Sequence, residues 1–591
     1  MTTATAGRSV DGMDDRHNTQ RAARMDCQVL VVGAGPTGLV LAADLLARGV
    51  PTRIIDKGDG VNLETRAIAI HARALEVLDL MGLAECFVEH GQVVRWFRFY
   101  ADGKPRLSLD LSRNGTRFGF MLDIPQHQTE CLLRARVAEL GGVIEQRAEL
   151  TGLTDEATGV TARVRDAGGQ VRVITASYVV GCDGAHSRVR HELGLAFHGH
   201  PYPQAWLLAD VRLDWARPEN MVHAFFRADG VPLICLPMRD HRWRLVVPFA
   251  GDRAPGAPDL GEVQQLVDQR APERVVVSDA SWLASFNCHR RSTDVYRRGH
   301  VLLAGDAVHI HTPAGGQGMN TGITDAHNLG WKLALVAAGR APGQLLDTYG
   351  CEREPVAAQV LGLTHALVRF GTMTHPVKRA LRDTIIPAAA HVGPIHRRAV
   401  RRWTQVNVGY PASSLTWPDR GRGRPRPGQR APDIQVRTQD GTSSLFSVLR
   451  RGRHVMVVTG TDPGGTLGRP ALEPYQDLFE VVTRGPGDAR ASRGGPVFLV
   501  RPDGYIAARG RPDRLETVLG YLRELSGETG ISRPGRRHPA SPTRRLPPFS
   551  DARPTVRCRG SRSACRSPAA VDFTIVRSML TAVAASRGPV C

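Results

Sequence analysis

The chain has 591 residues, 42% of them hydrophobic and 23% charged, with a formal net charge of +20. This length predicts about three to four domains, each able to bury a core of its own. No run of about 18 apolar residues lacks a charged residue, and the polar N-terminus has no apolar segment of signal-peptide type. We therefore expect neither a membrane span nor a secretory signal.

The positive charge is unevenly distributed. Residues 531–591 contain twelve Arg and two Asp, and so carry half of the net charge. Elsewhere no basic stripe alternates with aromatic residues, so we expect no nucleic-acid partner. The ten cysteines are far apart and form no Cys-x-x-Cys pair. This spacing suits neither a zinc site nor a disulfide scaffold, and it favours reduced thiols in a cytoplasmic protein.

In chain order, residues 1–24 are polar and predict a disordered extension. The apolar run Gln28–Val32 predicts a strand, apolar residues at helical spacing over Leu39–Arg48 predict a helix, and Val50–Asp56 predicts a second strand. The ordered part of the chain therefore opens with a βαβ unit.

Further runs of strand length follow along the chain, and one long buried helix. The strands are Val171–Val180, Leu233–Pro237, Arg244–Pro248 and His300–Leu303, and the helix is Ala326–Ala338. A linker rich in Arg, Pro and Gly at 418–430 precedes a small α/β domain with strands at Val455–Val458 and Val497–Val500. The fold class is therefore α/β.

The first chemical motif is a glycine loop between the first strand and the first helix. It reads Gly33-Ala34-Gly35-Pro36-Thr37-Gly38. The first glycine permits a tight turn, the second lets the backbone approach a pyrophosphate, and the third allows close packing of helix on sheet. Asp56, followed by Lys57, ends the second strand, where a carboxylate accepts hydrogen bonds from ribose hydroxyls. The loop predicts a dinucleotide site but does not distinguish NAD from FAD.

Two segments far along the chain favour FAD over NAD as the bound dinucleotide. Val179–Arg190 is a strand that leads into an acidic turn at Asp183, and Val301–His309 is a strand that ends in Gly305-Asp306. The glycine-rich stretch Thr312–Asn320 follows and leads into a helix, whose N-terminal amides stabilise an anion such as reduced flavin.

These three motifs, in this order and spacing, resemble the p-hydroxybenzoate hydroxylase superfamily of FAD-dependent aromatic monooxygenases, and the phenol, hydroxyphenylpropionate, polyketide and rifampicin hydroxylases in particular. The resemblance implies a Rossmann-like FAD-binding domain, an inserted β-sheet substrate domain and a C-terminal thioredoxin-like domain. It predicts an FAD-binding domain in two parts at 25–205 and 289–417, a substrate sheet at 206–288 and a thioredoxin-like domain at 431–526. The linker at 418–430 and the basic disordered tail at 527–591 are predicted from composition alone, since the tail has no counterpart in the family.

The resemblance also implies roles for single residues. The glycine loop would line the FAD pyrophosphate, and Asp56 would bind the adenosine ribose, although the family usually has Glu there. The further residues that would bind FAD are Lys57, Arg66, Gln126, Asp183, Gly305, Asp306, Gly318, Met319 and Asn320. Pro313 would pack beside the isoalloxazine, and the amides of Met319 and Asn320 would face the flavin O2.

Pro313 and His309 are the candidate catalytic residues, with a positioning role favoured for His309. We expect no metal site around His309 or His311. Phe225, Phe226, Leu233, Leu236, Met238 and Trp243 are candidates for the lining of the substrate pocket, although each also suits a core.

The implied reaction uses NAD(P)H and O2 to hydroxylate a phenolic or polyketide-like ring through a flavin C4a-hydroperoxide. The alternatives are a flavoprotein reductase or dehydrogenase of the same fold, a flavin-dependent halogenase, whose Trp-x-Trp-x-Ile-Pro motif is absent, and a flavin-bearing protein that sequesters an aromatic compound without turnover. No cysteine lies between Cys351 and Cys558, so the thioredoxin-like domain has no thiol pair for redox chemistry. A homodimer is compatible with these features.

Overall fold

The computed structural model describes residues 25–61, 67–227, 229–250, 258–310, 312–371, 373–390, 392–417, 425–459, 470–484, 495–511 and 515–528. The predicted N-terminal extension and the tail from residue 529 lie outside the described residues, as does the linker segment 418–424.

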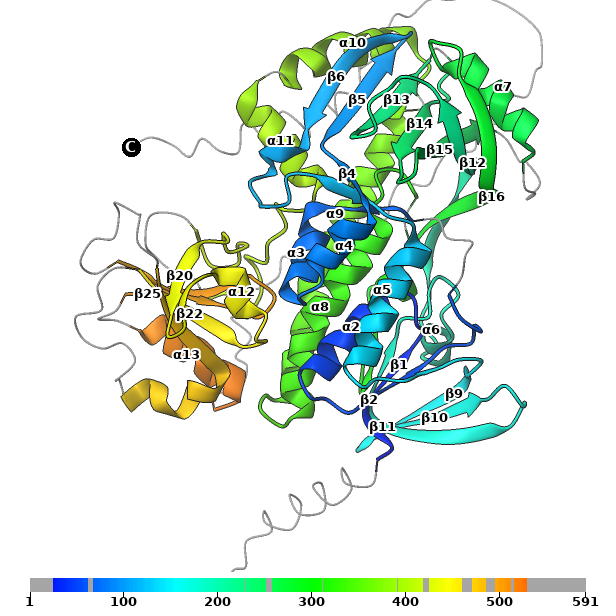
Figure 1. The fold of residues 1–591 in the computed structure, drawn as a ribbon. Coiled ribbons are helices and arrows are strands. Elements are labelled where there is room, and N and C mark those ends of the chain that lie inside the picture. The colour runs from blue at the N-terminus through cyan, green and yellow to red at the C-terminus, as the bar shows by residue number, and fades with distance from the viewer. Residues whose placement is uncertain are drawn as a thin grey trace, which may run out of the picture. The chain divides into compact units, whose positions relative to one another are not determined.

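The first sheet contains the predicted βαβ unit (Figure 1). β1 (Cys27–Val32) pairs in parallel with β2 (Thr52–Ile55) and with β11 (Val171–Gly181), which pairs in parallel with β18 (Val301–Leu303). Smaller strands complete this sheet: β8 (Ile144–Glu145), β9 (Glu149–Glu156), β10 (Gly159–Arg165) and β17 (Arg297–Arg298). The loops that follow the parallel strands therefore meet at one edge of the sheet, where α/β proteins bind ligands.

Helices cover this sheet and extend its core. α2 (Pro36–Ala47) lies between β1 and β2 and packs against α5 (Gln126–Glu139) and α8 (Gly318–Ala337). α2 begins with Pro36 at a position where a missing N–H costs nothing, and its residues from Gly38 to Leu45 are buried. The other helices of this region are α3 (Ala72–Leu80), α4 (Ala84–His90), α6 (Arg188–Glu192) and α9 (Asp347–Gly371), and β3 (Ala69–Ile70), β4 (Gln92–Val94) and β7 (Met121–Asp123) form a small separate sheet.

The second large sheet has the strand order β19-β16-β12-β15-β14-β13-β5-β6. Its strands are β5 (Trp96–Ala101), β6 (Lys104–Asp110), β12 (His198–Asp214), β13 (Met221–Phe226), β14 (Leu233–Pro237), β15 (Arg242–Ala250), β16 (Val276–Ser292) and β19 (His309–Ile310). It is broader than the predicted range 206–288, because β5 pairs in parallel with β13 and brings residues 96–110 into the sheet.

Strand alternation divides the predicted lining residues between the two faces of this sheet. Phe225, Leu233 and Trp243 lie in a core with α7 (Leu260–Arg270). Phe226 and Met238, with half-buried Leu236, lie on the opposite face, against α11 (Gly393–Trp403). Successive side chains of a strand point to opposite faces, so only the second group faces the side of the sheet that carries the helices α10 (Pro376–Ala390) and α11 (Figure 1).

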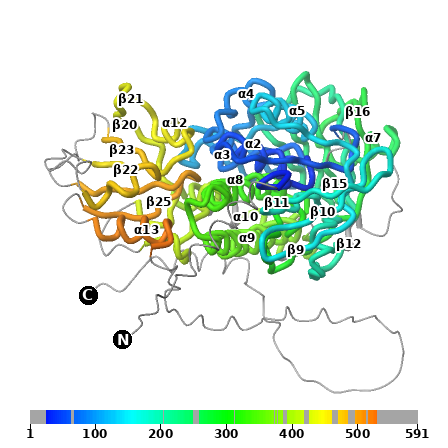
Figure 2. The backbone as a smooth tube through the Cα atoms, turned by 90° about the horizontal axis from the view of Figure 1, so that it is seen from below, coloured from blue at the N-terminus to red at the C-terminus, as the bar shows by residue number. Residues whose placement is uncertain are grey.

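The C-terminal elements form a third sheet, drawn in yellow and orange in Figure 2. Its strand order is β21-β20-β23-β22-β24-β25, with a parallel pair at the centre. The elements are β20 (Gln435–Thr438), β21 (Gly441–Ser444), α12 (Leu445–Leu449), β22 (His454–Val458), β23 (Phe479–Arg484), β24 (Val497–Val500), β25 (Ile506–Gly510) and α13 (Glu516–Ser526).

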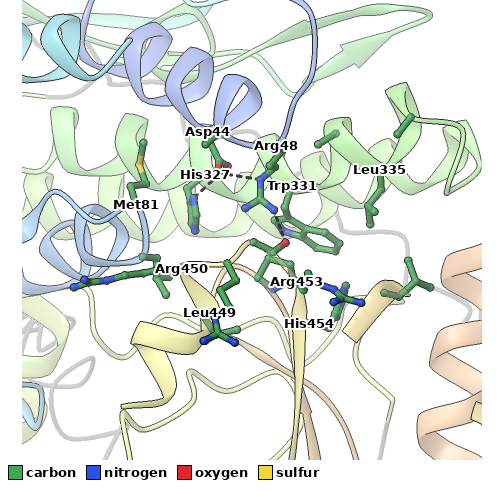
Figure 3. Close-up of a pocket in the computed structure, with 18 of the residues that line it drawn as sticks. Asp44, Arg48, Met81, His327, Trp331, Leu335, Leu449, Arg450, Arg453 and His454 are labelled. Atoms are coloured by element: carbon green, nitrogen blue, oxygen red, sulfur yellow. Dashed lines mark hydrogen bonds and ion pairs between the residues drawn. The ribbon is translucent and has the colours of Figure 1, made fainter. Parts of the chain in front are cut away.

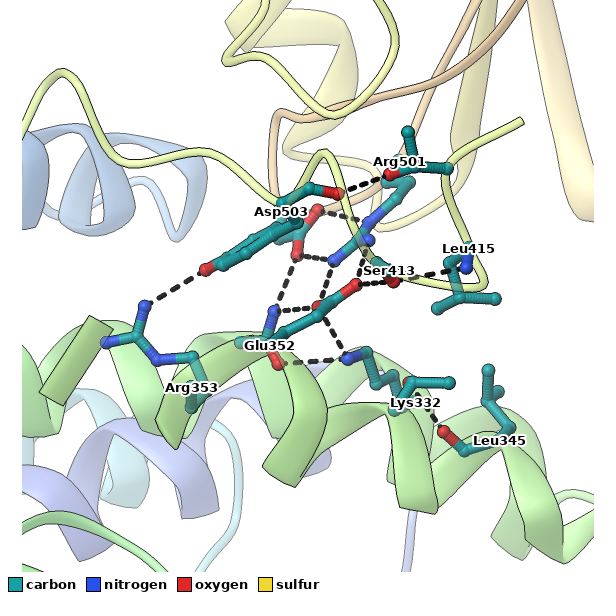
Figure 4. Close-up of polar contacts among 12 residues, drawn as sticks. Lys332, Leu345, Glu352, Arg353, Ser413, Leu415, Arg501 and Asp503 are labelled. Carbon is teal, nitrogen blue, oxygen red and sulfur yellow. Dashed lines mark hydrogen bonds and ion pairs between the residues drawn. The ribbon is translucent and has the colours of Figure 1, made fainter. Parts of the chain in front are cut away.

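A buried network of charges joins this C-terminal region to the helices α8 and α9 (Figure 4). Glu352 on α9 accepts two hydrogen bonds from the Arg501 guanidinium, at 2.6 and 2.9 Å, and one from the Lys332 ammonium at 2.8 Å. Asp503 pairs with Arg501 on its other side. The side chains of all four residues are at most 2% exposed. Such a network fixes one relative arrangement of the elements that carry it, because breaking any member leaves a buried charge unpaired.

Candidate active site

The glycine loop follows β1 and lies against the segment that follows β11. A Cβ added to Gly33 would lie 2.5 Å from the Cys182 carbonyl oxygen, and one added to Gly38 would lie 1.9 Å from the Gly33 carbonyl oxygen. Gly33 also has φ of +104°, a conformation that disfavours other residues. A Cβ on Gly35 would meet nothing within 4 Å. The first and third glycines are thus required by packing, whereas the second borders open space.

The first and third motifs also touch. A Cβ on Gly305 would lie 2.5 Å from the Thr37 hydroxyl, and one on Gly322 would lie 2.3 Å from the same oxygen. Thr37 is therefore enclosed between the η2 turn (Gly305–Ala307) and α8. Asp306, in that turn, is exposed at the same edge of the sheet. The three motifs that the sequence spreads over nearly 300 residues form one site.

Asp56 and a residue that the sequence did not single out, Arg134, hold the outer side of the glycine loop. Asp56 accepts hydrogen bonds from the backbone amides of Ala34, at 2.5 Å, and Gly58, at 2.7 Å. Arg134 on α5 donates to the carbonyl oxygens of Ala34 and Gly60 at 3.4 and 3.3 Å, and its Nε has no hydrogen-bond partner. Neighbouring Lys57 is exposed.

Asp183 caps the short helix α6. One carboxylate oxygen accepts from the backbone amides of Arg188 and Val189, at 2.6 and 3.1 Å, and the other has no hydrogen-bond partner. Burial raises the pKa of this carboxyl. Gln126, at the start of α5, donates to Glu130 at 2.9 Å. Arg66 lies outside the described residues.

Hydrogen bonds from His71 and Asn320 fix the conformation of the loop from Pro313 to Gln317. The His71 ring lies 2.8 Å from the Gly315 carbonyl oxygen, and the Asn320 side chain donates to Gly316 at 2.7 Å and accepts from the His71 amide at 2.7 Å. Burial lowers the pKa of His71 to about 4, so the ring is neutral at pH 7. Pro313 accepts a hydrogen bond from the Gly316 amide, which closes the turn.

This loop presents the N-terminus of α8. The first amides of a helix have no acceptor within it and form the positive end of its dipole. Gly318 and Met319 provide such amides, and a Cβ on Gly318 would meet nothing within 4 Å. The Asn320 side chain, by contrast, is engaged in holding the loop.

His309 lies behind this site and not on its surface. It is fully buried, and its Nε2 lies 2.7 Å from Asp325 on α8. Arg353 donates to the other oxygen of Asp325, Oδ1, at 2.6 Å. The Gly305 amide donates to Oδ2, the oxygen next to His309, at 3.3 Å. Burial alone would raise the pKa of Asp325, but Arg353 and His309 lower it. These contacts favour the positioning role for His309, since a ring without exposed surface cannot touch a substrate. His311 lies outside the described residues.

These residues fit FAD. Open space at Gly35, an unpartnered Arg134 nitrogen beside the loop and the exposed Asp306 are features that would suit a diphosphate and a polyol chain. The free helix amides at Gly318 and Met319 suit an anionic ring edge.

Four contributors have no sequence signature: His71, Arg134, Asp325 and Arg353. Each is a single residue within an ordinary helix or at its start, and each is placed by tertiary contacts. Their polar character did not single them out, because α5 and α9 contain many other polar residues.

Comparisons with known proteins identify the family of this chain. Residues 26–364 match the FAD binding domain family, and residues 424–528 match the C-terminal domain of aromatic-ring hydroxylases. The chain is 35% identical over 503 residues to the 12-dehydrotetracycline 5-monooxygenase/anhydrotetracycline 6-monooxygenase of Streptomyces rimosus, covering 83% of this chain and 96% of that protein. It is 34% identical to the rifampicin monooxygenase of Streptomyces venezuelae, covering 82% of this chain and 95% of that protein.

The fold has the same relatives. The structure of OxyS anhydrotetracycline hydroxylase from Streptomyces rimosus superposes with a TM-score of 0.70 at 34% identity, covering 85% of this chain and 99% of that one. The fold and the site define a flavin-binding oxidoreductase with several sheets and a C-terminal hydroxylase domain. The chain belongs to the FAD-binding aromatic-ring hydroxylases, and its activity is that of an FAD-dependent aromatic monooxygenase. No helix among the described residues is long and apolar enough to cross a membrane.

Proposed function

We propose that this monooxygenase hydroxylates a polycyclic, phenolic compound of polyketide type, with NAD(P)H as the reductant. The observation that carries the substrate class is the apolar sheet face next to the Pro313 loop. Ala314 of that loop packs in one cluster with residues of this face, including half-buried Leu236 and Ile234. Half-buried aromatic side chains surround them: Phe99, Trp282, Phe286 and Trp403. Flat, apolar walls of this extent suit a multi-ring substrate.

The names of the relatives support the same class, since they act on tetracycline intermediates and on rifampicin. This largely apolar sheet also carries a buried pair of opposite charges. Arg244 pairs with Asp210 through two hydrogen bonds of 2.7 Å, and its guanidinium lies 5.0 Å from the centre of the Trp282 ring. The positive charge of Arg244 also acts on Asp123, whose carboxylate oxygens have no hydrogen-bond partner. Burial raises the pKa of Asp123 well above its usual range. These groups provide polar contacts for substrate oxygens.

The proposed division of work follows the site. Non-covalently bound FAD would supply the acceptance of hydride from NAD(P)H and the activation of O2. The glycine loop, Asp56, Lys57, Arg66, Gln126 and Asp183 hold its dinucleotide part, Gly305 and Asp306 hold the ribityl chain, and the amides of Gly318, Met319 and Asn320 stabilise the reduced ring. Pro313 stiffens the loop so that the sheet and the loop exclude water.

The remaining parts of the proposal concern the whole chain. The domain bounds are those predicted from the sequence, with β5 and β6 added to the substrate sheet. The order β20-β23-β22-β24-β25, followed by a terminal helix, supports a thioredoxin-like C-terminal domain without redox activity. The unpaired cysteines, such as Cys27 and Cys182, support a cytoplasmic location. A homodimer is proposed and is tested by light scattering.

The experiment is a comparison of NAD(P)H oxidation and product formation with tetracyclic and monocyclic phenols. We expect the tetracyclic compounds to stimulate oxidation at lower concentrations and to gain a hydroxyl group. Leu236→Ala, on the flavin side of the sheet, should raise KM at least threefold. Leu233→Ala, on the α7 side, is the matched control and should reduce stability while leaving KM unchanged. Equal stimulation by monocyclic phenols, or equal effects of the two variants on KM, would contradict the proposal.

A further inference from the structure

A cavity of about 340 Å³ lies between helices α2 and α8 of the FAD-binding region and the C-terminal sheet (Figure 3). Its volume falls within the range of small-molecule sites. Asp44 comes from α2 and Arg48 directly follows that helix. His327 and Trp331 come from α8, and the segment from Leu449 to His454 comes from the C-terminal region. The cavity is lined by the C-terminal halves of α2 and α8, whose N-termini carry the flavin motifs, so it is distinct from the flavin site.

The lining is strongly basic. Six arginines line the cavity against two aspartates. Arg450 and Arg451 have carboxylate partners, but Arg340 and Arg453 donate only to backbone carbonyls at Gln476 and Asp477. Neither of these two has a carboxylate within 4 Å among the described residues. Both guanidinium groups therefore meet at the Asp477 carbonyl oxygen, and neither has an ion-pair partner within the part of the chain that the structure describes.

The inner wall holds polar atoms that lack a partner. His327 is 2% exposed, and its Nε2 makes no hydrogen bond, while its Nδ1 lies 3.3 Å from Asp44. Trp331 is 1% exposed, and its indole nitrogen also has no hydrogen-bond partner. Burying a polar group without a partner is costly, and both residues belong to the lining of the cavity.

We propose that this cavity is a second, anion-binding site that takes a small phosphate-bearing molecule. Guanidinium forks match phosphate oxygens in geometry and charge. Arg340 and Arg453 meet the phosphate from the C-terminal side, and His327 and Trp331 face it from α8. The apolar side chains of Met81, Leu335 and Leu449 line the remaining wall and suit a flat organic group attached to the phosphate.

The test is direct binding by calorimetry to the FAD-loaded enzyme, with inorganic pyrophosphate and ADP as probes and the ionic strength held constant with chloride. Bound FAD fills its own diphosphate site and so removes that competitor. We expect saturable binding of pyrophosphate with one site per chain. The double variant Arg340→Ala/Arg453→Ala should weaken it at least tenfold, and Arg453→Lys, which keeps the charge but not the fork, should weaken it less.

Arg437→Ala is the matched control, because Arg437 is an exposed arginine of the same domain outside the cavity. It should leave binding unchanged. ADP binding that the double variant also weakens tenfold would support the site and identify a nucleotide as the better ligand if it is tighter than pyrophosphate. The proposal is overturned if pyrophosphate does not saturate, or if the double variant and the control bind both probes as the wild type does. A flavin spectrum identical in all variants shows that each one is folded.

Discussion

Glu352→Gln tests how the C-terminal domain is held. Four buried charges meet at this position, two positive on Lys332 and Arg501 and two negative on Glu352 and Asp503, so their sum is zero (Figure 4). The substitution keeps the volume of the side chain and leaves one uncompensated positive charge in the interior. Breaking a buried pair in this way costs about 3–5 kcal/mol, and we expect the free energy of unfolding to fall by that amount.

The assay is urea unfolding at pH 7, followed by circular dichroism, for Glu352→Gln, Lys332→Met and the double variant. The double variant restores neutrality and leaves the Arg501–Asp503 pair intact, so it should recover at least about 1 kcal/mol relative to the sum of the single changes. A Glu352→Gln variant within about 0.5 kcal/mol of the wild type, or strict additivity, would refute the reasoning, because neither is compatible with a tightly coupled buried network.

The same network predicts a pH dependence. Burial alone would raise the pKa of Glu352, but Arg501 and Lys332 lower it well below its usual range. A carboxyl whose pKa is depressed in the folded state contributes stability that is fully present above its unfolded pKa, about 4.3, and is lost as the pH falls toward the folded pKa. The difference in stability between wild type and Glu352→Gln should therefore shrink below that pH and stay constant from about pH 6 to 7.

Four further substitutions test the flavin site. Gly35→Ala should lower the flavin content but keep the fold, since its Cβ would meet nothing within 4 Å. Gly38→Ala should lower both the flavin content and the stability, because its Cβ would lie 1.9 Å from a carbonyl oxygen. Flavin absorbance and melting temperature distinguish the two variants. Asp306→Ala should weaken FAD binding by about 1.5–3 kcal/mol, measured by flavin fluorescence; unchanged affinity would remove Asp306 from the site. Pro313→Gly should raise hydrogen peroxide release at the expense of product, with the rate of flavin reduction unchanged. A variant that still converts NAD(P)H into product without extra peroxide would show that the stiffness of this loop is not needed.

The sequence predicts the elements with strong local signals. β1, β2, β11, β14, β18, β22 and β24 overlap the predicted strands, because buried strands are short apolar runs, and α8 contains all but the last residue of the predicted helix. The glycine motifs meet because they follow neighbouring parallel strands. Long-range pairing was not predictable. β5 and β6 enter the substrate sheet because β5 pairs in parallel with β13. The paired residues Trp96 and Met221 are 125 positions apart in the sequence, and no local pattern specifies β13 as the partner.

The supporting residues of the site were equally hidden. His71, Arg134 and Asp325 acquire their roles only when α3, α5 and α8 are brought to the motifs, and a single polar residue in a helix usually faces solvent. The division of Phe225 and Phe226 between two sheet faces follows from strand alternation, but which face adjoins the Pro313 loop depends on the packing of the two sheets.

The central claim is that this chain inserts an oxygen atom from O2 into an aromatic ring. The most direct measurement is mass spectrometry of the product formed under ¹⁸O₂ in ordinary water, with NAD(P)H consumption and peroxide assayed in the same reaction. One ¹⁸O atom per hydroxyl group gained, with one NAD(P)H consumed per product after correction for peroxide, is the expected result. A hydroxylated product without the label would mean that water supplies the oxygen, and would contradict the monooxygenase mechanism.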